Sequence, residues 1–174
     1  MLNLNVHFWS AFGQEQPLAI ILQEHFKYMA SIRITRTPYE EPHHVNLLFE
    51  ASNDGQSTKF EYYCNATDLS DIADQLEVFP RHNQDVFLYE FGSERLEDRH
   101  SYYFRLRVFL TNGVGGCAIQ IRTNNNQELP DREISEFCII AESSQINRLG
   151  KLFRSYSKLH HAVLYWQVES GEVS

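Results

Sequence analysis

The clearest pattern in the chain is a regular alternation of apolar and polar positions between Ser101 and Arg122. Alternation with a period of two indicates a strand with one buried face. The alternation stops at Thr111–Gly116, where Asn-Gly accepts the positive φ angles of a tight turn, and then resumes. The sequence therefore predicts a long hairpin. One face is aliphatic, and the other carries Arg105, Arg107 and Arg122.

The same kind of alternation predicts further strands, at residues 2–9, 32–35, 45–51, 58–64, 85–91 and 136–141. Apolar residues at 3.6-residue spacing predict helices, at residues 17–30, 67–79 and 143–158. Thr67 and Ser143 are the expected N-caps of the last two helices. The sequence leaves the secondary structure of two segments undecided. Residues 17–30 also fit a strand, and residues 160–174 fit either a helical turn or a closing strand.

The order of these elements predicts an α+β fold. Short turns between consecutive strands favour antiparallel pairing. We expect a mostly antiparallel sheet of about six to eight strands, with two or three helices packed on one face. Residues 1–174 are expected to form a single domain. Residues 45–160 form its main unit, and residues 1–36 a β-α-β extension.

The charge and the cysteines narrow the possible partners and the compartment. The net charge of −8 disfavours nucleic acid and is compatible with a basic protein partner, although solubility alone also explains it. Cys64, Cys117 and Cys138 are widely spaced and fall in predicted strands, which suggests buried, reduced thiols and a cytoplasmic location. No apolar run approaches the length of a membrane span, so no membrane partner is expected.

No motif for a catalytic, cofactor or metal site occurs, so we expect a protein that is not an enzyme and holds no cofactor or metal. One arrangement of histidines would support a different interpretation. His82 and His100 flank the strand at 85–91 and would approach Glu94 or Asp98 as a metal or general-base site. Solvated loop histidines are the simpler interpretation.

Two features of the sequence suggest a binding surface. Acidic segments occur at 39–41, 94–98 and 128–133, and aromatic and arginine side chains fall on the non-core face of the hairpin. The expected partner-binding residues are Glu40, Glu41, Glu94, Glu97, Asp98, Tyr103, Arg105, Arg107 and Phe109. In the alternative interpretation, the N-terminal 36 residues cover the hairpin face instead.

The segments TDLSDIADQL and EFCIIAESSQINRLGKLF, together with the layout of residues 45–160, resemble small bacterial α+β proteins encoded beside toxin genes. Such proteins act as immunity proteins. The resemblance implies a non-enzymatic cytosolic inhibitor that occludes the active site of a basic toxin. Two alternatives stay open. One is a small-molecule or enzymatic pocket lined by Phe87, Tyr89 and Tyr102, and the other is a homodimer that buries the aromatic sheet face.

Overall fold

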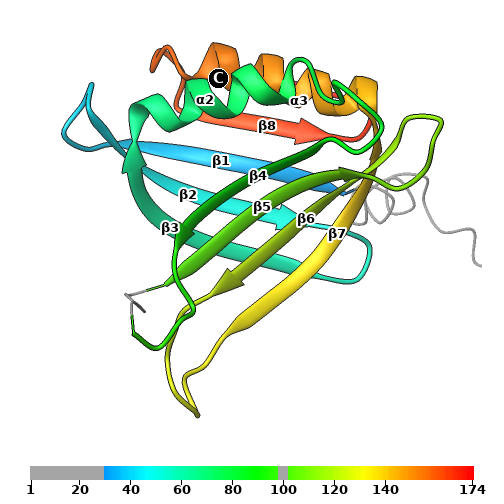
Figure 1. Ribbon diagram of the computed structural model, residues 1–174. Coiled ribbons are helices and arrows are strands. Elements are labelled where there is room, and N and C mark those ends of the chain that lie inside the picture. The colour runs from blue at the N-terminus through cyan, green and yellow to red at the C-terminus, as the bar shows by residue number, and fades with distance from the viewer. Residues whose placement is uncertain (1–29, 98–101) are drawn as a thin grey trace, which may run out of the picture.

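The structure is a computed structural model that describes residues 30–97 and 102–174 (Figure 1). The elements predicted at 2–9 and 17–30 lie outside the described residues, apart from Ala30. The described chain has an α+β fold, as predicted. Its elements are β1 (Ser31–Pro38), β2 (His44–Ser52), β3 (Ser57–Asn65), α2 (Ala66–Leu76), β4 (Val86–Gly92), β5 (Tyr103–Leu110), β6 (Gly116–Asn124), β7 (Ile134–Glu142), α3 (Ser143–Tyr156), β8 (Val163–Gln167) and β9 (Gly171–Val173). None of the described helices is long and apolar enough to cross a membrane.

The strands form two antiparallel sheets, whereas the sequence predicted one. Sheet A has the order β3-β2-β1-β8-β9, and sheet B has the order β4-β5-β6-β7. The prediction missed the division because alternation identifies the buried face of a strand and not the layer that covers it. Sheet B matches its prediction closely, since the hairpin β5–β6 is flanked by β4 and β7 and pairs Arg105 with Arg122.

The inner faces of the two sheets meet in a core that is rich in aromatic side chains. The ring of Phe104 on sheet B lies 4.8 Å from that of Phe49, 5.7 Å from that of Phe60 and 5.3 Å from that of Tyr62, all on sheet A. The aliphatic face of the hairpin therefore packs largely against the other sheet, and not only against helices as expected. Burial of this face supplies the main hydrophobic stabilisation of the layer.

Helices α2 and α3 lie side by side across one end of the sheets (Figure 1). Their predicted caps were wrong by one or two residues. Asn65 precedes α2 and makes no side-chain cap, while Glu142 caps α3 in a capping box with Gln145. Ser143 instead donates from its backbone N–H and its hydroxyl to the carbonyl of Gly115, at 3.0 Å each. The β5–β6 turn therefore holds the start of α3.

The C-terminal segment, left open by the sequence, forms strands. β8 pairs with β1, with Ile34 opposite Leu164, and β9 closes the edge of sheet A. Trp166 of β8 is fully buried and donates from Nε1 to the Gln145 carbonyl at 3.1 Å. β1, grouped with the N-terminal extension in the sequence, is thus the middle strand of sheet A.

Candidate functional site

The outward-facing side chains of sheet B form rows that run across its four strands. The strand register places Glu90, Arg105, Arg122 and Glu136 in one line, which we call the ion-pair row. The register places Val86, Phe109, Ala118 and Ile140 in another line, nearer the β5–β6 turn, which we call the apolar row. The face predicted to carry arginines therefore has two chemically different ends.

The arginines of the ion-pair row are neutralised by carboxylates. Arg105 Nη2 lies 2.8 Å from Glu136 Oε1, and Arg122 Nη1 lies 2.5 Å from Glu136 Oε2. Arg122 Nη2 also lies 2.9 Å from Glu94 Oε1. Burial opposes ionisation of Glu94, but hydrogen bonds from Arg122 and Asn124 hold the pKa of Glu94 below its usual value. The row is a pre-organised network and not a free cationic surface.

The aromatic side chains expected on this face are less accessible than alternation alone suggests. Tyr103 is buried, and its hydroxyl donates to Glu90. Desolvation, followed by that hydrogen bond, raises the pKa of Tyr103 to about 12. The guanidinium of Arg107 lies 4.7 Å above the ring of Phe109, a cation–π contact. Arg107 Nη1 also donates to Gln120 Oε1 at 3.4 Å.

Beyond the ion-pair row, two loops that are distant in sequence meet at one end of sheet B (Figure 1). We call this region, residues 93–97 and 125–133, the acidic tip. Asn124 Nδ2 donates to Glu94 Oε1 at 2.6 Å, and Asn126 Nδ2 donates to the Ser93 carbonyl at 2.9 Å. Arg122 holds Glu94 from the sheet side. Two of the three predicted acidic segments are therefore joined in space.

The surface of the acidic tip combines negative charge with exposed leucines. Its acids are Glu94, Glu97, Glu128, Asp131 and Glu133, and its bases are Arg95 and Arg132, so five negative and two positive charges give −3. Leu96 is 82% exposed and Leu129 is 77% exposed. A hollow of about 380 Å³ beside the first loop is lined by Glu90, Glu94 and Tyr103, among others. This chemistry suits a cationic side chain flanked by apolar contacts.

The remaining predicted site residues lie elsewhere or outside the described residues. Glu40 and Glu41 are in the β1–β2 turn, where Glu41 pairs with Arg36 and Glu40 lies 3.6 Å from His44. Asp98 and His100 are not described. His82 Nε2 lies 3.9 Å from Asp85 Oδ1. Within residues 30–97 and 102–174, no cluster of three metal-ligating side chains occurs.

The structure also places the three cysteines and the residues expected to line a pocket. Cys64 and Cys117 are buried, while Cys138 is half-buried on the outer face of sheet B. Phe87, expected to line a pocket, is packed in the core, and Tyr89 donates from its hydroxyl to Asp68 Oδ2 at 3.1 Å. Desolvation by burial raises the pKa of Tyr89.

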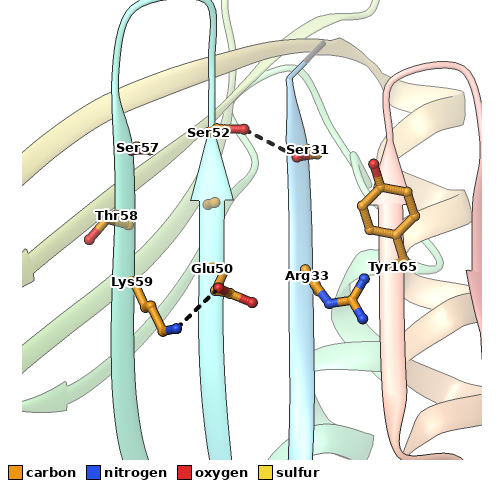
Figure 2. A pocket seen from close by; sticks show the side chains of 9 residues that line it. Ser31, Arg33, Glu50, Ser52, Ser57, Thr58, Lys59 and Tyr165 are labelled. Atoms are coloured by element: carbon orange, nitrogen blue, oxygen red, sulfur yellow. Dashed lines mark hydrogen bonds and ion pairs between the residues drawn. The ribbon is translucent and has the colours of Figure 1, made fainter. Parts of the chain in front are cut away.

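An open hollow of about 370 Å³ lies on the outer face of sheet A (Figure 2). Its floor is polar. Lys59 Nζ lies 3.6 Å from Glu50 Oε1, and the hydroxyls of Ser31 and Ser52 are 3.2 Å apart. Arg33 and Tyr165 stand beside each other on β1 and β8. This face offers hydrogen-bonding groups, and Tyr63 of β3 adds an aromatic side chain that is 46% exposed.

Sequence reasoning missed Asn124, Asn126 and Glu136, the side chains that connect the tip to the sheet. The run Asn124-Asn125-Asn126 carried a signal, because asparagine side chains commonly bond to nearby backbone in turns. Asn125 does so within its own loop, where its Oδ1 accepts from the Glu133 N–H at 3.0 Å. The partners of Asn124 and Asn126 lie some thirty residues away, and local pattern does not identify them.

Comparison with known proteins identifies no family. No family model and no curated protein matches the chain. Among solved structures, the plant transcriptional regulator PBF-2 is similar, with 14% sequence identity and a TM-score of 0.42. That similarity covers 74% of this chain and 75% of that one.

Proposed function

We propose that the protein is a non-enzymatic binding protein that holds a basic protein partner on its acidic tip, in the manner of an immunity-type inhibitor that occludes the partner's active site. The observation that carries this proposal is the union of two acidic loops through Glu94 into one surface with two exposed leucines. Negative charge accelerates encounter with a cationic partner, and desolvated leucines then slow dissociation.

The network behind the tip supports a binding role. Arg122, Asn124 and Asn126 fix both loops before a partner arrives. Pre-organisation reduces the conformational entropy that binding would otherwise lose. The carboxylates of Glu97, Asp131 and Glu133 make no ion pair with a described residue, so their charge is directed to solvent. The ion-pair row itself is close to neutral and serves here as the support for the tip.

The test is co-purification with the products of neighbouring genes at about 50 mM and about 500 mM salt, since charge-steered binding weakens with ionic strength. We expect one basic product to bind, and Glu97→Lys with Glu133→Lys to reduce its association rate by roughly tenfold at low salt. Leu96→Asp with Leu129→Asp should accelerate dissociation. Glu169→Lys with Glu172→Lys, an equal charge change at two exposed positions in and beside β9, is the matched control.

If Glu169→Lys with Glu172→Lys weakened binding equally, the effect would come from net charge alone, and the tip would not be the binding site. Binding that none of these variants changes would place the partner elsewhere. If no basic neighbour binds at low salt, the proposal of an immunity-type function fails.

A further inference from the structure

The border of sheet A at β3 leaves main-chain groups unpaired. β3 (Ser57–Asn65) is paired on one side only, with β2, and contains neither glycine nor proline. In an antiparallel ladder, alternate residues direct their N–H and C=O groups toward the neighbouring strand, and the rest direct them away. The Tyr63 N–H donates to the Tyr102 hydroxyl at 3.4 Å and not to β2, so the odd-numbered residues of β3 face outward. Between Ser57 and Glu61, these outward groups bond to no residue of the described chain.

Two other borders of the sheets are protected in ways that β3 is not. β9 has only three residues, and on β7 the Cys138 carbonyl accepts from Asn53 Nδ2 at 3.0 Å. An exposed lysine commonly discourages pairing at an edge. Lys59 Nζ instead lies 3.6 Å from Glu50 Oε1 of β2, over the outer face of sheet A (Figure 2). The edge of β3 is therefore a template on which another strand can form.

Sheet B provides a floor beside this edge. Thr123 Oγ1 lies 2.8 Å from Thr58 Oγ1, and beyond Thr123 the chain continues into the acidic tip, so the end of sheet B projects past β3 (Figure 1). An open hollow of about 490 Å³ lies between the two, lined by residues 57–60 of β3 and by Thr123, Asn125 and residues 132–135. An added strand would lie about 4.8 Å from β3, where this hollow leaves room.

The side chains beside this edge define the chemistry of an added strand. In an antiparallel pair, directly opposite residues place their side chains on the same face of the sheet. Residues opposite Lys59 and Glu61 would therefore lie on the outer face, where an acidic side chain suits Lys59 and a basic one suits Glu61. The residues between and beside them would face sheet B, close to the hydroxyl of Thr123 and to the ring of Tyr102, which lies 4.9 Å from that of Phe60. Small aliphatic or hydroxyl side chains suit these positions.

A second copy of the chain fits this edge poorly, although Lys59 and Glu61 would each face the other's counterpart across a two-fold axis. Such a dimer would form one continuous sheet, with sheet B of each copy on the same side of it. The projecting end of sheet B, held over β3 by the Thr58–Thr123 contact, would then occupy the space of its counterpart. A single extended segment needs only the width of one strand and avoids this collision.

We infer that the free edge of β3 binds an extended segment of a partner protein as an added antiparallel strand, with a basic residue opposite Glu61 and an acidic residue opposite Lys59. Main-chain hydrogen bonds supply the attachment, and the alternating side chains select the sequence. This strand pairing requires neither a basic partner nor the acidic tip, so it stands apart from the proposed function.

The probe is the synthetic peptide acetyl-Val-Lys-Val-Glu-Thr-Thr-amide, whose lysine and glutamate fall opposite Glu61 and Lys59. When it is added at millimolar concentration to the full-length protein, we expect hydrogen exchange of the Lys59 and Glu61 amides to slow by on the order of tenfold, because both amides become hydrogen-bonded. The Phe60 amide, which faces β2, should change little. N-methylation of the peptide's lysine and glutamate should abolish the protection. N-methylation of its central valine, whose N–H faces away from β3, should preserve it.

Two protein variants separate main-chain pairing from side-chain contact. Glu61→Pro removes the outward N–H without removing a bond to β2, and it should weaken peptide binding by about tenfold. Glu61→Thr removes the charge but keeps the N–H, and it should weaken binding only about twofold. If Glu61→Pro does not fold, the peptide measurements on the wild-type protein decide the question.

Three results would overturn the inference. One is an exchange rate of the Lys59 and Glu61 amides that the peptide leaves unchanged. Another is equal binding of the two N-methylated peptides. The third is a protein that sediments as a dimer and becomes a monomer in Glu61→Pro, because a second copy would then fill the edge.

Discussion

Asp85 shows how one carboxylate fixes a connection between elements. It is 4% exposed and lies at the end of the segment that joins α2 to β4. Its Oδ2 accepts from the Arg81 backbone N–H at 2.7 Å and from Arg81 Nε at 3.2 Å. These hydrogen bonds hold the pKa of Asp85 below its usual value, although burial acts in the opposite direction. The loop therefore depends on the ionised form.

We predict that Asp85→Asn lowers the free energy of unfolding by about 1–3 kcal/mol at pH 7, because a charge-assisted acceptor of two N–H groups is lost. The folded pKa lies below the unfolded value of about 3.9, so this stabilisation is complete above about pH 5 and is lost as pH falls through the folded pKa. Urea unfolding from pH 7 to pH 2 measures both effects. The two proteins should converge at the acid end.

The control for Asp85 is Asp54→Asn, in the exposed β2–β3 turn, which should change stability little at any pH. A difference between wild type and Asp85→Asn that persists undiminished at pH 2 would show that the effect comes from packing and not from ionisation.

The crossing of α2 and α3 depends on a residue without a side chain. A Cβ at Gly150 would lie 2.4 Å from the Glu77 backbone nitrogen and 2.7 Å from the Leu76 carbonyl carbon. Backbone atoms cannot move aside as a flexible side chain does. Asn147 adds to the same contact, because its Nδ2 donates to the carbonyls of Leu76 at 3.0 Å and Phe79 at 2.6 Å. The two helices therefore form one tightly joined unit.

We predict that Gly150→Ala destabilises the protein by about 1–3 kcal/mol, even though alanine favours a helix by about 1 kcal/mol over glycine. The steric cost should exceed the gain in propensity, because the helices must separate to admit the methyl group. Thermal unfolding measures the effect. Ser144→Ala, on the exposed side of α3, is the control and should be neutral or slightly stabilising. A Gly150→Ala protein as stable as wild type would mean that the helices move apart at little cost.

These elements also show what the sequence is able to predict. The β5–β6 hairpin and its neighbours β4 and β7 follow from alternation and an Asn-Gly turn, both local signals. The division into two sheets does not, because the pairing of β1 with β8 joins residues more than a hundred positions apart. The acidic tip was predicted only as separate charged segments. Its assembly depends on Asn124 and Arg122 reaching Glu94 across the sheet, which no local pattern encodes.

At the scale of the whole molecule, the two sheets are joined face to face by their aromatic side chains. Phe104 of sheet B contacts the rings of Phe49, Phe60 and Tyr62 on sheet A. The ring centroids of Tyr102 and Phe60 are 4.9 Å apart. The helices contribute a second junction, because α3 follows β7 of sheet B and packs on β8 of sheet A. Each sheet needs the other to exclude water from its inner face. We therefore expect the described residues to unfold as one cooperative unit.

Phe104→Ala tests this cooperativity directly, because it removes a fully buried ring at the centre of the aromatic junction. We predict a loss of about 3–5 kcal/mol, the usual cost of deleting a buried phenylalanine. Native-state hydrogen exchange should show that the slowest amides of β2 and of β6 accelerate by the same factor, since both layers open in the same event. If β6 amides accelerate while β2 amides keep their wild-type rates, sheet A is stable without sheet B. The fold would then consist of two separable layers, and a partner bound at the acidic tip would stabilise only sheet B.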